Sequence, residues 1–177
     1  MQTLEITTGT GRHFYQFYKG REDLFRITLP FLFEGLLHGD ACLWLVSRSI
    51  GVLKAIEAFQ RQYDILRYIE NGQLLVFPAE RWYLVNGRFS ERKALHRLHR
   101  FTEERKKRGF TSFRGAGDGA WFDLRDWGKI QAYERKIHDW VLAHRVLAVC
   151  AYPIEDCTVV QTRDVLEHHH SPFLTKL

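Results

Sequence analysis

The sequence predicts a single α/β domain in which a mostly parallel sheet is covered by helices on both faces. Three observations lead to this prediction. Short apolar runs alternate with longer helical patterns, their spacing suits βαβ units, and no linker rich in Pro, Gly and Ser divides the 177 residues. Parallel strands are joined by crossovers that are usually helical, and helices then bury both faces of the sheet. We therefore expect one domain over residues 1–177.

The first elements are an aromatic run, a long helix and a buried strand. The run His13–Tyr18 holds four aromatic rings, an imidazole and an amide. It is either a buried first strand with His13 as a satisfied polar end, or one wall of a small-molecule site. A helical pattern spans 21–38, and Pro30 inside it should kink or divide the helix. The continuous apolar run 41–46 is typical of a central strand.

The rest of the chain continues this alternation. The expected helices show helical periodicity or start at capping side chains, and cover 49–62, 65–70, 90–108, 126–141 and 164–169. The expected further strands are 73–77, 110–114 and 146–152, with a loop at 80–89 and a Gly-rich turn at 115–119. Ligands of such sheets bind beyond the carboxyl ends of the strands, so residues that follow strands are the first site candidates.

Charge and hydrophobicity exclude two classes of partner. The net charge is +5, but the densest basic cluster, Glu103–Arg108, mixes acids with bases and closes a helix, where cations favour the macrodipole. We expect no direct nucleic-acid contact. The longest apolar stretch, Ile27–Leu37, is short and interrupted, so we expect no membrane span.

The N-terminus and the cysteines predict a cytoplasmic protein. Met1–Glu5 has no basic region followed by an apolar one, which is the pattern of a secretion leader. Cys42, Cys150 and Cys157 are odd in number and lack CxxC spacing, so they predict reduced thiols rather than disulfides or a zinc site.

No motif predicts catalysis, a metal or a cofactor. Gly9–Arg12 is similar to the end of a phosphate-binding loop, but Arg12 stands for the lysine and His13 for the hydroxyl. The histidines do not form a ligand pattern, and three adjacent imidazoles at His168–His170 cannot all face one ion from a regular helix. Cys150 lies in an apolar strand, where a thiol is usually inert. We expect a non-enzymatic protein.

The segment Arg114–Trp121 combines groups that suit a binding site. It holds an arginine at the predicted strand end, a glycine turn, the carboxylate of Asp118 and the indole of Trp121. The alternative is a tight turn in which Asp118 caps local backbone amides.

Several segments together resemble the MEDS domain, the methanogen/methylotroph sensory domain also found in the repressor of dichloromethane dehalogenation. They occur in the family's order and cover nearly the whole chain. The resembling segments are His13–Tyr18, Glu22–Gly35, Cys42–Ser47, Trp82–Tyr83, Asn86–Phe89, Arg114–Gly115, Gly117–Asp118, Trp121 and Cys150–Pro153.

The resemblance implies a RecA-like three-layer sandwich with a degenerate phosphate loop and a sensory role toward small hydrocarbon-like ligands. Members often carry the domain beside a DNA-binding or histidine-kinase module. Neither pattern is found in the 177 residues, so we expect a signal to pass to a separate kinase or regulator, or through self-association.

Combining residues and resemblance, we predict a sensory domain that binds a small apolar or weakly polar ligand over the carboxyl edge of the sheet. His13, Phe17 and Tyr18 would form one wall. Further ring contacts and the few polar contacts complete the predicted site, and come from Trp121, Tyr152, Arg114 and Asp118. Two alternatives stay open: a degenerate nucleotide-binding protein or weak ATPase, and an interaction module that docks a kinase or repressor.

Overall fold

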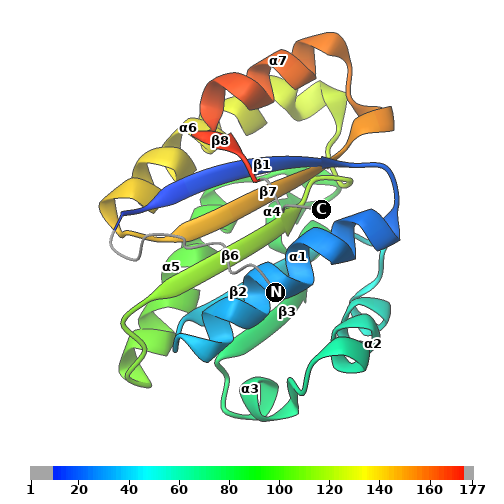
Figure 1. The fold of residues 1–177 in the computed structure, drawn as a ribbon. Coiled ribbons are helices and arrows are strands. Elements are labelled where there is room, and N and C mark those ends of the chain that lie inside the picture. The colour runs from blue at the N-terminus through cyan, green and yellow to red at the C-terminus, as the bar shows by residue number, and fades with distance from the viewer. Residues whose placement is uncertain (1–9, 174–177) are drawn as a thin grey trace.

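A computed structural model describes residues 10–173 as a six-stranded parallel sheet between two layers of helices (Figure 1). Met1–Glu5 and Gly9, which entered the predictions above, lie outside the described residues. The strand order is β3-β2-β6-β7-β1-β8, and every pairing in this sheet is parallel. The predicted α/β sandwich is confirmed.

The strands of the large sheet are short and mostly apolar. They are β1 (Arg12–Tyr18), β2 (Ala41–Val46), β3 (Leu74–Pro78), β6 (Phe113–Asp118), β7 (Leu147–Pro153) and β8 (Ser171–Pro172). A separate hairpin joins β4 (Leu84–Val85) to β5 (Arg88–Phe89). The aromatic run is therefore a strand, and it lies between β7 and β8 near one edge of the sheet.

Within residues 10–173, seven α-helices connect the strands. They are α1 (Arg21–Leu37), α2 (Val52–Gln62), α3 (Leu66–Glu70), α4 (Ala79–Tyr83), α5 (Glu91–Lys107), α6 (Trp127–Ala143) and α7 (Val159–His168). Two 3₁₀ turns, η1 (Leu124–Asp126) and η2 (Ile154–Asp156), precede α6 and α7. Ser90 caps α5 through its side chain, and Thr158 with Gln161 forms a capping box on α7.

Two apolar cores lie on the two faces of the sheet. The first joins α1, α2 and α3 to Phe14, Trp44 and Val149. The second joins α4, α5 and α6 to Leu43 and Phe113. Side chains alternate between the faces along each strand, so alternate residues of β1 serve different cores. In Figure 1, α7 lies beside α6 at the β1 end of the sheet.

Several predicted elements differ from the structure. The helix predicted over 49–62 begins only at Val52, after Gly51, which provides no side-chain cap. Pro30 does not divide α1. Its ring is exposed on the side away from the core, while the neighbouring apolar side chains of α1 pack into the core. The stretch 80–89 contains most of α4 and the small hairpin rather than only loop. The last helix begins at Val159, earlier than predicted, because Thr158 caps it.

The largest difference concerns the predicted Gly-rich turn. Residues Gly115–Asp118 belong to strand β6, which is paired on both sides with β2 and β7. Hydrogen bonding to two neighbours keeps these glycines extended, although their intrinsic preference is for turns. A Cβ at Gly117 would lie 3.9 Å from the Tyr83 hydroxyl, an ordinary van der Waals contact.

Within residues 10–173, no helix combines the length and the apolar character needed to cross a bilayer.

Candidate functional site

A satisfied polar network lies at the carboxyl edge of the sheet. Asp118, at the end of β6, accepts hydrogen bonds from the Tyr18 hydroxyl at 2.6 Å, the Ser47 amide at 3.2 Å and the Ala120 amide at 3.0 Å. The Ser47 hydroxyl also donates to it. Burial and the neighbouring Asp118 raise the pKa of Tyr18, so the phenol stays protonated as a donor. Asp118 therefore ties together three strand ends.

The connection between β1 and α1 does not have the form of a phosphate loop. A phosphate loop needs several residues between a strand and the following helix, but only Lys19 and Gly20 separate β1 from α1. Glu22 and Asp23 occupy the first turn of α1, where they oppose an anion. Thr10, Gly11 and Arg12 precede or open β1, at the opposite end of that strand.

Arg114 lies away from the predicted ligand edge. It occupies the second position of β6, about 13 Å along the strand from Asp118. Its guanidinium donates to Asp40 at 2.9 Å, to the Phe31 carbonyl at 2.8 Å and to Glu34 at 3.1 Å. The prediction that Arg114 ends a strand beside Asp118 is wrong, because β6 continues through the glycines. These contacts explain Arg114 as a link between α1 and the sheet.

The predicted wall of His13, Phe17 and Tyr18 is divided between the two faces of the sheet. Tyr18 joins the core beneath α1, whereas His13 lies next to Glu134 of α6 and Phe17 packs near Tyr152 of β7. The reason is strand alternation: residues 13 and 17 share one face, and residue 18 points to the other.

An array of rings runs along the α6 face toward the carboxyl edge. Tyr152 lies at the centre, with ring centroids 6.1 Å from Phe17, 5.6 Å from Phe122 and 5.9 Å from His169. Phe122 contacts Trp121 at 4.5 Å. Three of the predicted residues, Phe17, Trp121 and Tyr152, thus belong to one continuous array. The rings pack against one another, and Trp121 and Phe122 are only partly buried.

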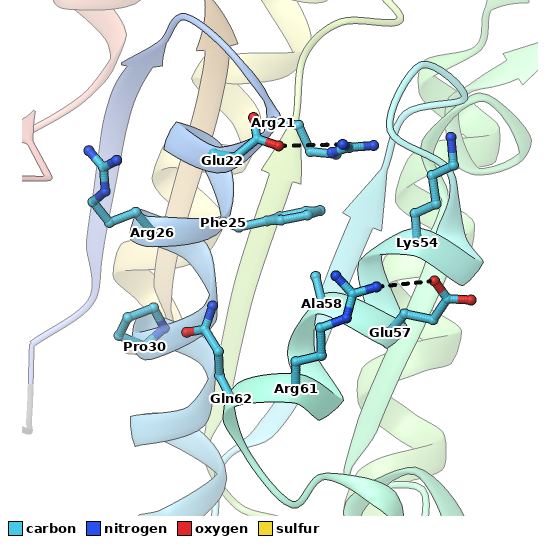
Figure 2. A pocket seen from close by; sticks show the side chains of 10 residues that line it. All are labelled: Arg21, Glu22, Phe25, Arg26, Pro30, Lys54, Glu57, Ala58, Arg61 and Gln62. Atoms are coloured by element: carbon cyan, nitrogen blue, oxygen red, sulfur yellow. Dashed lines mark hydrogen bonds and ion pairs between the residues drawn. The ribbon is translucent and has the colours of Figure 1, made fainter.

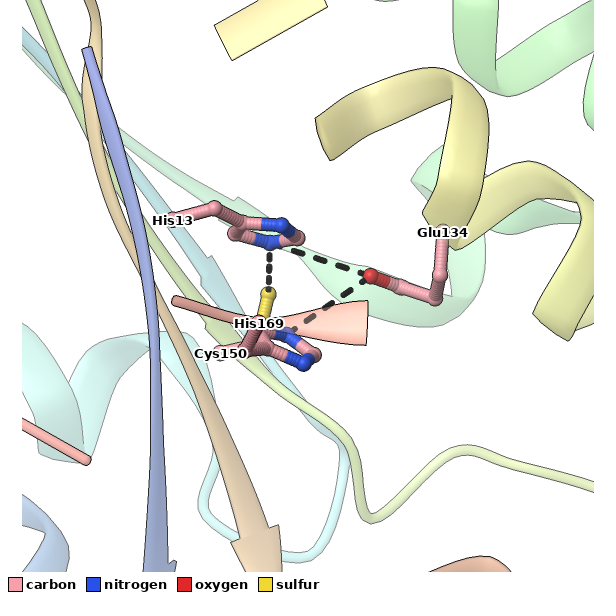
Figure 3. Close-up of side chains that lie close together, drawn as sticks. All are labelled: His13, Glu134, Cys150 and His169. Atoms are coloured by element: carbon pink, nitrogen blue, oxygen red, sulfur yellow. Dashed lines mark hydrogen bonds and ion pairs between the residues drawn. The ribbon is translucent and has the colours of Figure 1, made fainter. Parts of the chain in front are cut away.

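The inner end of this array is a cluster of four polar side chains, three of them buried and Cys150 partly buried. We call it the His13 cluster: His13, Glu134, Cys150 and His169 (Figure 3). His13 Nε2 lies 3.2 Å from Cys150 Sγ and 3.8 Å from Glu134 Oε2. His169 Nε2 lies 3.9 Å from the same Glu134 oxygen. The four groups come from β1, α6, β7 and the residue after α7.

Burial keeps all four groups of the His13 cluster in their neutral forms. It raises the pKa of Glu134 to about 8 and lowers that of His169 to about 4. Burial, followed by the neighbouring imidazoles, lowers the pKa of His13, and burial with Glu134 raises that of Cys150. The close His–Glu pairs are therefore not ion pairs near neutral pH. Among residues 10–173, Glu134 Oε2, His169 Nε2 and His13 Nδ1 find no hydrogen-bond partner.

Sequence reasoning singled out only His13 of these four residues. Glu134 falls within the helix predicted over 126–141, where a single acid is not distinguished from the other charged side chains. Cys150 was interpreted as an inert strand residue, and His169 as part of a histidine run. Only the pairing of β1 with β7 and the packing of α6 and α7 bring them together.

A hollow lies between α1 and α2, with a volume of about 580 Å³ (Figure 2). Its lining is mainly charged and includes Arg21, Glu22, Lys54, Glu57 and Arg61. Arg21 pairs with Glu22 and Arg61 with Glu57, so four of the six charged side chains in the lining neutralise each other. None of the predicted site residues lines it.

Comparison with known proteins places this α/β sandwich in a sensory class. The family model of the MEDS domain, described as the methanogen/methylotroph, DcmR sensory domain, matches residues 12–170. The chain belongs to this family. A search of curated proteins found no match.

Proposed function

We propose that this MEDS domain is a non-enzymatic sensor of a small apolar or weakly polar molecule, and that the ligand is held by the ring array of Phe17, Phe122, Trp121 and Tyr152. The observation that supports this function is the array itself. It gathers rings from β1, β7 and the segment after β6 at the carboxyl edge, where ligands of parallel sheets bind.

The packing of the array suggests how binding would change the protein. Trp121 stacks on Tyr83 at 4.1 Å and Phe122 approaches Trp127 at 5.6 Å, and we propose that a ligand enters by displacing one of these partly buried rings. Binding would then favour a second arrangement of the segment between β6 and α6, to the extent that the ligand prefers it. Cys150 is partly buried and its pKa is raised, so it offers no ready thiolate, which supports a role without catalysis.

Helix α7 is the route we propose for the output. It ends beside His169, whose ring contacts Tyr152, and its outer surface exposes Val159, Val160 and Leu166. Exposed aliphatic side chains on one helix suit contact with a separate signalling protein or a second copy of the chain. We also propose a cytoplasmic location, which the free Cys42, Cys150 and Cys157 support.

The ligand proposal is tested by thermal denaturation with a panel of small hydrocarbon-like and weakly polar organic molecules. A ligand that binds the native state raises the midpoint, and the rise grows with the logarithm of the ligand concentration above Kd. Trp121→Ala should abolish the shift, while the matched Trp140→Ala, a partly buried indole stacked on His144, should keep it. The proposal fails if no compound raises the midpoint, or if both variants respond equally.

The output route has its own test, which is hydrogen exchange of the α7 amides with and without a compound from that screen. We expect changed protection at the carboxyl end of α7. Unchanged exchange throughout 159–168 with a bound ligand would contradict the route.

A further inference from the structure

The His13 cluster has the donor atoms and the shape of a transition-metal site. Its four candidate ligand atoms, one from each side chain, lie within 4.8 Å of one another. Tetrahedral zinc with bonds of roughly 2.0–2.3 Å requires ligand atoms about 3.3–3.8 Å apart. The His13–Cys150, His13–Glu134 and His169–Glu134 separations of 3.2, 3.8 and 3.9 Å already fall close to this range. Side-chain adjustments below 1 Å would complete the shell.

The orientation of His169 supports a role as a ligand. Its Nδ1 lies 2.7 Å from the Val165 carbonyl, an acceptor, so Nδ1 carries the proton. Nε2 then presents its lone pair toward the interior of the cluster, where it has no partner among the described residues. A backbone carbonyl that fixes the tautomer in this way is the usual outer support of a metal-bound histidine.

The unpartnered atoms are a second, independent observation. Glu134 is 7% exposed, and its Oε2 faces both imidazoles without accepting a hydrogen bond in the described part of the chain. His13 is fully buried, and His169 is 8% exposed. Buried polar atoms are rarely left without partners, since each costs about 1–3 kcal/mol. A cation at the centre would satisfy the Glu134 oxygen and the His169 nitrogen together.

We propose that His13, Glu134, Cys150 and His169 bind one divalent transition-metal ion of the zinc type. A thiolate and a carboxylate balance its charge of +2, and two neutral imidazoles complete four-coordination. The thiol and the nitrogen donors favour Zn²⁺, or Co²⁺ as its probe, over Mg²⁺ and Ca²⁺, which prefer oxygen. Four protein ligands inside the core describe a closed site, which would fasten β1 and β7 to α6 and to the end of α7.

The test uses Co²⁺ added to the full chain after treatment with a chelator. We expect one ion per chain, with the visible bands of tetrahedral Co²⁺ and a thiolate-to-metal charge-transfer band in the near ultraviolet. Zn²⁺ should displace the colour and raise the thermal midpoint. Cys150→Ser should remove the charge-transfer band, whereas the matched Cys157→Ser, at a half-buried thiol outside the cluster, should keep the full spectrum.

Glu134→Gln separates binding from folding. A neutral amide of nearly the same size replaces the carboxyl group, so this variant should fold. Its affinity for Co²⁺ should nevertheless fall by about 100-fold or more, because a carboxylate ligand is lost. Binding with an octahedral spectrum, or equal affinity in Cys150→Ser, Glu134→Gln and the native chain, would overturn the proposal.

The metal site stands apart from the proposed ligand of the ring array. Trp121→Ala should leave the Co²⁺ spectrum unchanged, since Trp121 does not belong to the His13 cluster. A chain that binds Co²⁺ tetrahedrally but responds to no organic compound would refute the ligand proposal alone. A chain that responds to a compound after chelation but binds no Co²⁺ would refute the metal site alone.

Discussion

Two clusters of polar side chains lie on opposite faces of the same sheet. They differ in whether their buried polar atoms have hydrogen-bond partners. Around Asp118 every acceptor is used, by Tyr18, Ser47 and Ala120. In the His13 cluster, buried atoms of Glu134 and His169 lack partners among residues 10–173. A hydrogen-bond network in which every polar atom has a partner is accounted for by the fold alone. Buried polar atoms without partners call for a bound group that would satisfy them. This contrast is why we assign Asp118 to structure and the His13 cluster to binding.

The largest effect on stability is expected from removing Asp118, the centre of the complete hydrogen-bond network. Asp118→Ala leaves the buried Tyr18 hydroxyl and the Ser47 amide without their acceptor, and we expect the free energy of unfolding to fall by about 3–4 kcal/mol. Urea denaturation followed by circular dichroism measures this change. The loss should be the same with and without Zn²⁺. A loss below about 1 kcal/mol would show that the network does not hold the strand ends.

The pH dependence of stability tests the incomplete cluster in the metal-free protein. Native Glu134 keeps its proton up to about pH 8, while the unfolded chain releases it near 4.5, so the native state binds more protons between these values. The free energy of unfolding therefore falls as pH rises there. His13 and His169, with lowered pKa values, act oppositely below about pH 6.5, because the unfolded chain then binds more protons.

We therefore expect maximum stability of the metal-free chain near pH 6.5 and a loss of about 2 kcal/mol between pH 6.5 and 8. Urea denaturation across this range measures it. Glu134→Gln has no carboxyl proton to lose and should flatten the upper limb. An equally steep limb in that variant would assign the loss to another group.

Local sequence patterns predicted the strands and helices correctly where the intrinsic preference of a segment matched its surroundings in the folded sheet. The apolar runs of β2 and β7 are strands because they are apolar throughout and buried on both faces. Strand β6 was mispredicted because its glycines favour turns in isolation. Its central place between two partners, which no local pattern encodes, holds it extended.

The site was predictable only in part, for a similar reason. An aromatic residue such as Tyr152 at a strand end is visible in the sequence, and so is the acid of Asp118. The meeting of His13, Cys150 and His169 depends on pairing between segments 137 and more residues apart, and on which face of α6 turns inward. Sequence periodicity fixes the face of an element but not the element that it meets.

Two glycines test how tightly the rings of the array are packed. A Cβ at Gly119 would lie 2.9 Å from the Tyr152 ring and 3.0 Å from the Phe122 ring, whereas a Cβ at Gly115 meets nothing within 4 Å. Gly119→Ala must displace the rings and should cost about 1–2 kcal/mol. Gly115→Ala should stay within about 0.5 kcal/mol of the native chain. Thermal denaturation of the two variants measures the difference, and equal midpoints would show that the rings yield freely.

The smallest effect on Co²⁺ affinity is expected from a histidine that lies just outside the His13 cluster. His138 also has a buried Nδ1 without a partner in the described chain, and its ring centroid lies 5.8 Å from that of His13. Its ring stacks on that of His170 at 4.6 Å, however, and it is not one of the four candidate ligands. If unsatisfied burial alone attracted the ion, His138→Gln would weaken Co²⁺ binding as strongly as His169→Gln. Because coordination also requires convergence on one point, we expect His138→Gln to change the affinity by no more than about twofold, against about 100-fold or more for His169→Gln. Parallel titrations of the two variants decide between these accounts, and similar losses in both would move the site toward α6 and His170.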